Sequence, residues 1–360
     1  MSDPLLGPSR QIVVREDWLR QTQEPTLEPA LPIVDPHHHL WARPHGPESY
    51  LLPDLLADTG SGHDIRGTIF VQCGEMYRAA GPEERRSLGE TEFVTGIAAV
   101  SASGRHGATR ACAGIIGMVD LTLGDRVTPL LEAHAAIAGG RFCGIRNRTA
   151  WHPSPEVTSN LVTPPPGPLE HPAFAAGARR LAAFGLPLDV WAYHTQLPHV
   201  LALARAVPEL TVVVDHVGGP LGIGPFAGKQ AEVFPEWKKQ ILALAALPNT
   251  VVKLGGLTMY VTGFDFHRRP KPPGSAELAE AWRPYIETCI EAFGAARCMF
   301  ESNFPVDKGM CSYPILWNAL KRLAAGAGTD EKTALFSGTA MRVYRLTRLP
   351  DGLGVDLASR

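Results

Sequence analysis

The sequence lacks the features that mark several common classes of protein. Its 34 Lys and Arg residues are matched by 36 Asp and Glu residues, so no basic excess is available to neutralise phosphates and we expect no nucleic-acid partner. No apolar run approaches the roughly 18 residues of a membrane span, and residues 1–10 have no apolar signal-peptide core. The six Cys residues show no CxxC spacing, which favours reduced thiols. We therefore expect a cytoplasmic protein without a membrane partner.

Instead, the sequence has a regular alternation of two kinds of segment. Short apolar runs, typical of parallel strands covered on both faces, occur at residues 33–39, 67–72, 113–119, 142–147, 187–193, 211–216, 250–255 and 297–303. Helical periodicity occurs at residues 128–138, 173–184, 197–206, 235–246, 276–293, 314–325 and 330–344. No glycine-rich phosphate loop follows the first run, which argues against an open doubly wound sheet. The alternation predicts an α/β protein of the (β/α)8 TIM-barrel class.

The predicted barrel forms a single domain over residues 32–360, with an N-terminal extension over residues 1–31 lying outside the main core. Three long Pro- and Gly-rich segments follow the fourth, sixth and seventh strands, at residues 151–172, 217–234 and 258–275. In a TIM barrel, loops that follow strands lie on the catalytic face. Loops of this length are usually lids or binding loops.

Four histidines stand at the ends of predicted strands. His37 and His39 alternate on the first strand and therefore share a face. His194 and His216 end the fifth and sixth strands, in register with Leu188, Val190 and Ala192 and with Val212 and Val214. If these faces point inward, the four imidazoles converge at the barrel mouth, where they could bind a metal ion. The alternative is that each is a core histidine with a backbone partner.

Cationic and polar side chains accompany these histidines at the predicted mouth. Arg146 and Arg148 share a face at the end of the fourth strand, and guanidinium groups bind carboxylates through two hydrogen bonds. We expect them to contact substrate, although a salt bridge at the rim is an alternative for Arg146. Gln72 and Lys253 are further candidates for substrate binding.

The combination of motifs resembles a known family. The Asp35-x-His37-x-His39 strand, the turn over residues 215–218 and the closing run over residues 300–305 resemble the amidohydrolase superfamily. Within it, residues 32–346 are similar to the amidohydrolase-related branch of sugar-lactone and pyrone-dicarboxylate lactonases and, more distantly, to a muconate-semialdehyde decarboxylase. The resemblance implies that His37, His39, His194 and His216 hold one divalent ion, commonly zinc. Some lactonases of this branch work without metal.

One position departs from the family pattern. Where the family usually has an Asp as general base at the end of the eighth strand, this chain has Asn303. An amide cannot accept a proton, so Glu301, on the same face, or Asp307, in the following loop, is expected to take that role. The alternatives are a buried ion pair of Glu301 with Lys253 and a helix cap or turn for Asp307.

These observations predict an enzyme that hydrolyses a small cyclic ester, a lactone, by attack of water on the ring carbonyl. Its substrate would be a small molecule, acidic or polyhydroxylated, and the residues leave the possibility of a homo-oligomer open. Amide hydrolysis and non-oxidative decarboxylation on the same barrel are alternatives. A catalytically inactive barrel that binds a ligand is another, which the Asn303 substitution supports.

Overall fold

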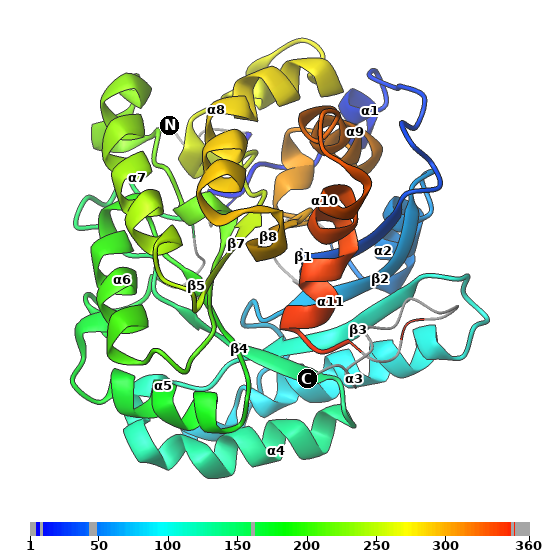
Figure 1. The fold of residues 1–360 in the computed structure, drawn as a ribbon. Helices are drawn as coiled ribbons and strands as arrows, with labels where there is room; N and C mark the ends of the chain where they lie inside the picture. Colours follow the sequence, from blue (N-terminus) through cyan, green and yellow to red (C-terminus); the bar gives the residue numbers. More distant parts are fainter. Residues whose placement is uncertain (1–4, 8–9, 43–48, 160–162, 347–348, 350–360) are drawn as a thin grey trace.

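Eight parallel strands form the centre of the molecule. A computed structural model describes residues 5–7, 10–42, 49–159, 163–346 and 349, so the outer ends of the predicted extension and domain lie outside the described residues. The strands follow one another in chain order (Figure 1). They are β1 Pro32–His38, β2 Asp64–Val71, β3 Arg110–Gly117, β4 Phe142–Arg148, β5 Leu188–Trp191, β6 Val212–Val214, β7 Thr250–Leu254 and β8 Cys298–Phe300.

The two edges of this sheet meet just beyond β8. The Asn303 N–H donates to the His37 carbonyl at 2.9 Å, and the His39 N–H donates to the Phe304 carbonyl at 2.8 Å. These bonds close the barrel, and helices surround it (Figure 1). The predicted (β/α)8 TIM barrel is therefore confirmed, and each of the eight predicted runs contains a strand.

The helices lie between the strands, with two deviations from the predicted pattern. They are α1 Glu16–Leu19, α2 Leu52–Thr59, α3 Leu88–Ala102, α4 Thr128–Ala138, α5 Phe174–Ala183, α6 Leu197–Ala206, α7 Gln230–Ala245, α8 Ser275–Phe293, α9 Tyr313–Leu323, α10 Thr329–Thr333 and α11 Thr339–Val343. The start predicted for α7, at Pro235, is wrong: Pro favours first helical positions, but here it lies inside the helix. The helix predicted over residues 330–344 is confirmed, but a π-helical turn at Ala334–Gly338 interrupts its α-helical geometry between α10 and α11.

A local irregularity in β1 decides which of its histidines face the interior. The pairing of β1 with β2 shifts register between Asp35 and His38, which is a bulge that reverses the alternation of side chains. After it, His37 and His39 point inward, where their ring centroids lie 4.9 Å apart. His38 points outward, where its Nε2 lies 2.9 Å from the Thr68 hydroxyl.

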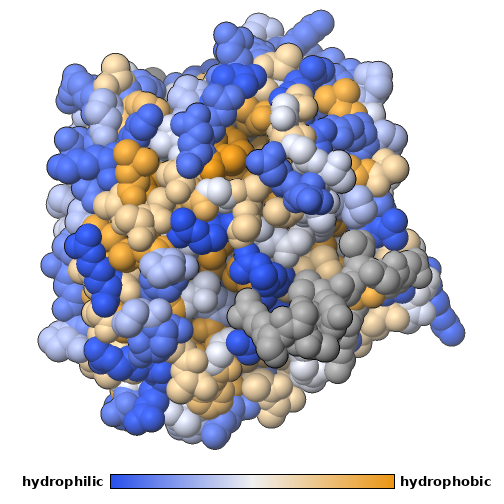
Figure 2. All heavy atoms as spheres, in the orientation of Figure 1, coloured by the Kyte–Doolittle hydropathy of each residue, from blue (hydrophilic) through white to orange (hydrophobic). Residues whose placement is uncertain are grey.

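The amino-terminal end of the barrel is closed by apolar side chains. Inward residues of the strands form a cluster there with the C-terminal helix α11, which crosses the barrel in Figure 1. Its members include Val34, Ile69, Val213, Val251, Met299, Met341 and Tyr344. On the outer surface of the same face, hydrophobic residues are interspersed among hydrophilic ones (Figure 2).

The segment before β1 packs against the barrel. Ile12 belongs to the largest apolar cluster and is 5% exposed. Trp18 is buried, and its Nε1 donates to the Arg269 carbonyl at 3.0 Å. The Lys321 ammonium donates to the carbonyls of Leu27 and Glu28, each at 2.8 Å. These contacts fix the segment over the loops that follow β7 and β8.

Among the described helices, none combines the length and the apolar character needed to cross a bilayer.

Candidate active site

A pocket opens at the carboxyl ends of the strands and encloses about 60 Å³ of free volume. Its floor and walls come from strand ends, from the long loops and from the N-terminal segment. The lining residues are Gln11, His39, Trp41, Cys73, Arg146, Arg148, Ser159, Trp191, His216, Met259, Asn303 and Val306. Ser159 belongs to the predicted loop 151–172 and Met259 to the loop 258–275, so two of the three long loops reach the site as expected for the catalytic face.

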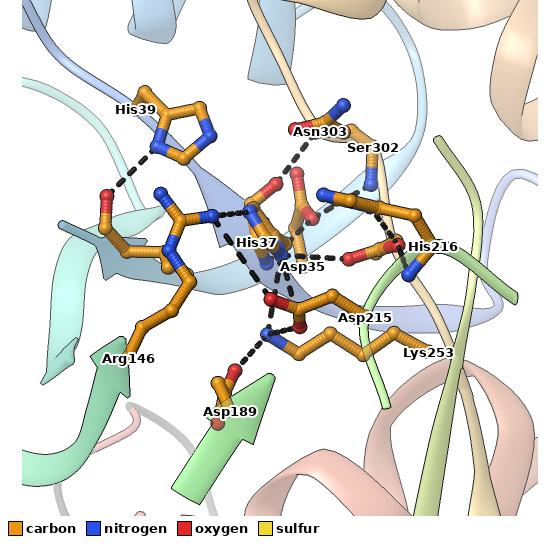
Figure 3. A network of polar contacts seen from close by, with 12 residues as sticks. Asp35, His37, His39, Arg146, Asp189, Asp215, His216, Lys253, Ser302 and Asn303 are labelled. Carbon is orange, nitrogen blue, oxygen red and sulfur yellow. Dashed lines mark hydrogen bonds and ion pairs between the residues drawn. The ribbon is translucent and has the colours of Figure 1, made fainter. Parts of the chain in front are cut away.

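His37 lies below the pocket at the centre of a charged network (Figure 3). Arg146 Nη1 donates to its Nε2 at 3.3 Å, so the proton of the neutral ring sits on Nδ1. That atom lies 2.8 Å from Glu301 Oε2 and 3.2 Å from the ammonium of Lys253. Burial and the charge of Lys253 hold the pKa of His37 well below its ordinary value. Asp215 Oδ1 lies 3.7 Å from the same Nδ1 nitrogen, so His37 is a neutral imidazole surrounded by four ionisable groups.

His216 and Glu301 form a pair beside His37. Glu301 Oε1 accepts from the His216 ring Nδ1 at 2.6 Å and from its backbone N–H at 3.2 Å. The backbone φ of His216 is +54°, a sparsely populated value, and this re-aims a side chain that strand alternation would point outward. Gly256 makes room for it, because a Cβ there would stand 2.5 Å from the His216 Cβ. Burial lowers the pKa of His216 to about 3 and raises that of Glu301.

His39 reaches the pocket from the end of β1. Its Nδ1 lies 2.8 Å from the Val71 carbonyl, and because a carbonyl only accepts, Nδ1 carries the proton. The Nε2 lone pair is then left for the pocket. Burial, with the nearby charge of Arg146, lowers the pKa of His39 well below its ordinary value, so the ring is a neutral hydrogen-bond acceptor.

Lys253, predicted as a substrate-binding residue, is fully buried and forms ion pairs with carboxylates other than Glu301, the alternative partner. Its ammonium lies 2.5 Å from Asp189 Oδ2 and 3.4 Å from Asp215 Oδ1, and no ion pair with Glu301 occurs among the described residues. Burial lowers the pKa of Lys253, but the carboxylates of Asp189 and Asp215 raise it more. The Tyr344 hydroxyl lies 2.9 Å from the Asp189 carboxylate. A buried charge network therefore connects the site to the chain after α11.

Asn303 and Asp307 form a second polar pair at the end of the barrel. The Asn303 amide donates to Asp307 Oδ1 at 2.9 Å, and Asn303 lines the pocket whereas Asp307 lies behind it. Burial raises the pKa of Asp307 to about 8. Asp307 is therefore protonated near neutral pH, which suits a proton donor better than a base.

The predicted substrate-binding residues differ in their surroundings. Arg146 is buried and is tied to Gln72 on β2: its Nη2 donates to the Gln72 carbonyl, and Gln72 Nε2 donates to the Arg146 carbonyl at 3.3 Å. Arg148 lines the pocket and makes no hydrogen bond or ion pair with any residue in the described part of the chain. Among the described residues, nothing therefore occupies the guanidinium group of Arg148, which faces the pocket.

His194 lies away from this group. It begins a 3-10 turn after β5, its Nδ1 accepts from the Leu221 N–H at 3.3 Å, and its ring packs on Phe226. The expectation that Leu188 and Val190 face the interior is wrong, because both belong to the outer cluster under the helices. The strand β5 instead points Asp189 and Trp191 inward, and it ends before the alternation could bring His194 to the mouth.

Several members of the site were not among the predicted site residues, and three of them contact predicted ones directly. Asp189 and Asp215 pair with Lys253, and the Trp191 ring packs on His216 with centroids 4.8 Å apart. A signal was present, because Asp189 is a lone charge within an apolar strand run. Such a charge needs a buried partner, and Lys253 in another apolar run is its complement.

The donors around His37 suit a divalent cation. Ligand atoms of His37, His216 and Glu301 all lie within 4.8 Å of one another, and the burial of both imidazoles keeps them neutral, the form that binds metal. Glu301 Oε2 lies 2.8 Å from His37 Nδ1, and Asp215 Oδ1 lies 3.4 Å from the Lys253 ammonium. These buried carboxylates stand beside the two imidazoles, and carboxylate oxygens and imidazole nitrogens are ligands that a divalent cation such as zinc uses. His39 and His194 are not part of this group of three.

The family follows from a match over most of the chain. The family model named amidohydrolase matches residues 34–346. The chain therefore belongs to the amidohydrolase family and is a hydrolase, as the sequence motifs predicted.

Three individual proteins are similar to this chain over most of their length. The uncharacterized protein y4mH of Sinorhizobium fredii is 30% identical over 334 residues, which cover 87% of this chain and 98% of that protein. An L-fucono-1,5-lactonase of Burkholderia multivorans is 26% identical, covering 88% of this chain and 97% of the lactonase. A crystal structure of a Burkholderia multivorans amidohydrolase with bound zinc has a TM-score of 0.67 at 24% identity, covering 88% and 99% of the two chains. Its likeness establishes the shared barrel.

Proposed function

We propose that this chain hydrolyses a small lactone. The observation that carries the proposal is the pocket itself, where the Nε2 acceptor of His39 and the guanidinium groups of Arg146 and Arg148 face one space. An acceptor for the proton of water beside donors for a developing oxyanion is what ester hydrolysis requires. The similarity to an L-fucono-1,5-lactonase supports a lactone as the ester.

His37, His216 and Glu301 are the residues that would hold one divalent ion, and zinc is our proposal because a neighbouring structure contains it. When bound, the ion would polarise the ester carbonyl and lower the pKa of water. Lys253 and Arg146 already supply positive charge beside His37. The carboxylates of Asp215 and Glu301 balance both.

The chain's own residues account for the proton transfers. His39 Nε2 accepts a proton as the water oxygen attacks the ring carbonyl carbon, and Arg146 donates to the oxyanion. The ring C–O bond then breaks, and the proton on His39 passes to the leaving alkoxide, which yields the hydroxy acid. Asn303, held by Asp307, positions the attacking water.

Arg148 completes substrate binding in this proposal. It has no anionic partner among the described residues, so a carboxylate or a hydroxyl-rich ring would satisfy its guanidinium group. The packed Trp191 ring provides an apolar wall on the side of His216. The substrate is therefore an acidic or polyhydroxylated lactone.

The test is a panel of sugar and dicarboxylate lactones followed by proton release, with metal content measured on the same sample. We expect turnover with the wild type and a loss of about 100-fold or more in kcat with His39→Gln, because general-base catalysis contributes roughly 10²–10⁴-fold. His199→Gln, which changes an exposed histidine on α6, is the matched control and should retain wild-type activity.

Other outcomes have distinct meanings. Release of CO2 instead of a proton would replace lactone hydrolysis with decarboxylation. Tight ligand binding without turnover would indicate an inactive barrel. Full activity in His39→Gln would remove the assigned base.

A further inference from the structure

The N-terminal segment crosses the mouth of the barrel and reaches the active site. Arg10 Nη1 donates to the Glu156 carbonyl at 2.6 Å, and Arg15 Nη2 donates to the His267 carbonyl. Ile12 packs on Gly309, where a Cβ would stand 2.5 Å from the Ile12 Cβ. The segment is thereby attached to loops that follow β4, β7 and β8, and it brings Gln11 into the wall of the catalytic pocket.

A second cavity adjoins the catalytic pocket and shares part of its lining. It has a volume of about 250 Å³, against about 60 Å³ for the catalytic pocket. Gln11, Trp41 and Val306 line both cavities, so the two are adjoining chambers. The other residues of the second chamber are Ile12, Val14, Glu16, Ser49, Tyr50, Asp54, Pro305 and Lys308.

The chemistry of the second chamber favours an uncharged occupant. Most of its side chains are apolar or aromatic, and its ionic groups are already paired. Lys308 lies 3.0 Å from both Glu16 and Asp58, and the Asp54 carboxylate accepts from the Leu51 N–H at 2.9 Å. An anionic group would find the Lys308 ammonium already shared by two carboxylates, and any charged group would lose part of its hydration there. An apolar group would gain by leaving water.

We propose that the second chamber is a subsite for a neutral, largely apolar substituent carried by the lactone ring. The proposal rests on lactone hydrolysis as the function, and it adds a specificity element that the N-terminal segment builds. The amidohydrolase family model begins at residue 34, downstream of Gln11, Ile12 and Val14. The substrates of relatives therefore do not define this part of the site.

The experiment compares two substrates that differ only in the substituent, a bare six-membered lactone and the same ring carrying a butyl group. We expect the wild type to prefer the butyl lactone by about tenfold or more in kcat/KM, because burial of each methylene is favourable. Val14→Phe, which fills the chamber, should reduce this preference to within about twofold and leave the bare lactone unaffected. Gln21→Phe, at an exposed position of the same segment, is the control.

Each outcome supports or overturns the proposal. Equal kcat/KM for the two lactones in the wild type, or an equal loss for both in Val14→Phe, overturns the subsite while leaving lactone hydrolysis intact. If the wild type hydrolyses neither of these two lactones, the panel of sugar and dicarboxylate lactones decides whether the proposed reaction stands. Calorimetric titration with 2-butyltetrahydropyran then decides the subsite, since binding that Val14→Phe weakens supports it and no binding overturns it. Thermal unfolding of both variants checks that each is folded.

Discussion

The two ends of the barrel interior are built from the same strands but have opposite chemistry. At the amino-terminal end, Val213, Val251 and Met299 form an apolar layer under α11. Two residues after Val213 and Val251, Asp215 at the end of β6 and Lys253 within β7 are fully buried charges. The apolar layer is stabilised by packing alone, whereas the charged layer is stable only while every charge keeps its partner. The comparison indicates that each strand contributes to stability through its amino-terminal part and to the active site through its carboxyl-terminal part.

Removing the ammonium of Lys253 should have the largest effect on the stability of the charged end. Lys253→Met leaves Asp189 and Asp215 buried without their ammonium, so we expect the free energy of unfolding to fall by about 3–5 kcal/mol. Urea denaturation measures it. The double variant Lys253→Met with Asp189→Asn should recover part of the loss, and a double variant as unstable as the single one would contradict the pairing.

A cavity in the apolar layer should lower the stability of the fold and leave catalysis nearly unchanged. Met299→Ala removes a buried side chain and should cost about 2–4 kcal/mol, while kcat/KM of the folded protein stays within about threefold of wild type. Urea denaturation and a lactone assay below the transition measure the two effects. A large loss of kcat/KM here would show that the two layers are not separable.

The smallest expected effect is a pH dependence that belongs to the charged end. The pKa of Asp307 is raised to about 8 by burial, so the folded protein holds a proton that the unfolded chain releases near pH 4. Stability is therefore lost as pH rises between these values. Between pH 7 and pH 8 the wild type should lose about 1 kcal/mol more than Asp307→Asn. Parallel stability curves for the two proteins would show that Asp307 ionises normally.

The barrel and part of its site could be predicted because they depend on local pattern. The apolar runs located all eight strands, and the spacing of His37 and His39 placed both on one face even though a bulge intervenes. Arg146 and Glu301 were placed at strand ends for the same reason. Each of these inferences needs only the alternation of side chains along one strand and the rule that the active site of a barrel lies at the carboxyl ends of its strands.

The remaining features depend on contacts between distant segments, which no local pattern encodes. His194 does not reach the mouth of the barrel because β5 ends at Trp191 and the chain then turns away. His216 entered the site only through a positive φ beside Gly256. The wall formed by Gln11 comes from a segment whose composition suggested an appended extension. In each case tertiary packing overrode the alternation.

The hydroxyl of Tyr344 beside Asp189 has a consequence for how the protein matures in the cell. The ribosome makes Tyr344 after all eight strands, so a nascent chain can complete the sheet before the innermost carboxylate has its last hydrogen bond. Because a domain generally folds as a unit, the centre of this barrel is complete only after the segment that carries Tyr344 has been made. A translation product that stops short of this tyrosine would resemble the mature barrel and still be incomplete at its centre.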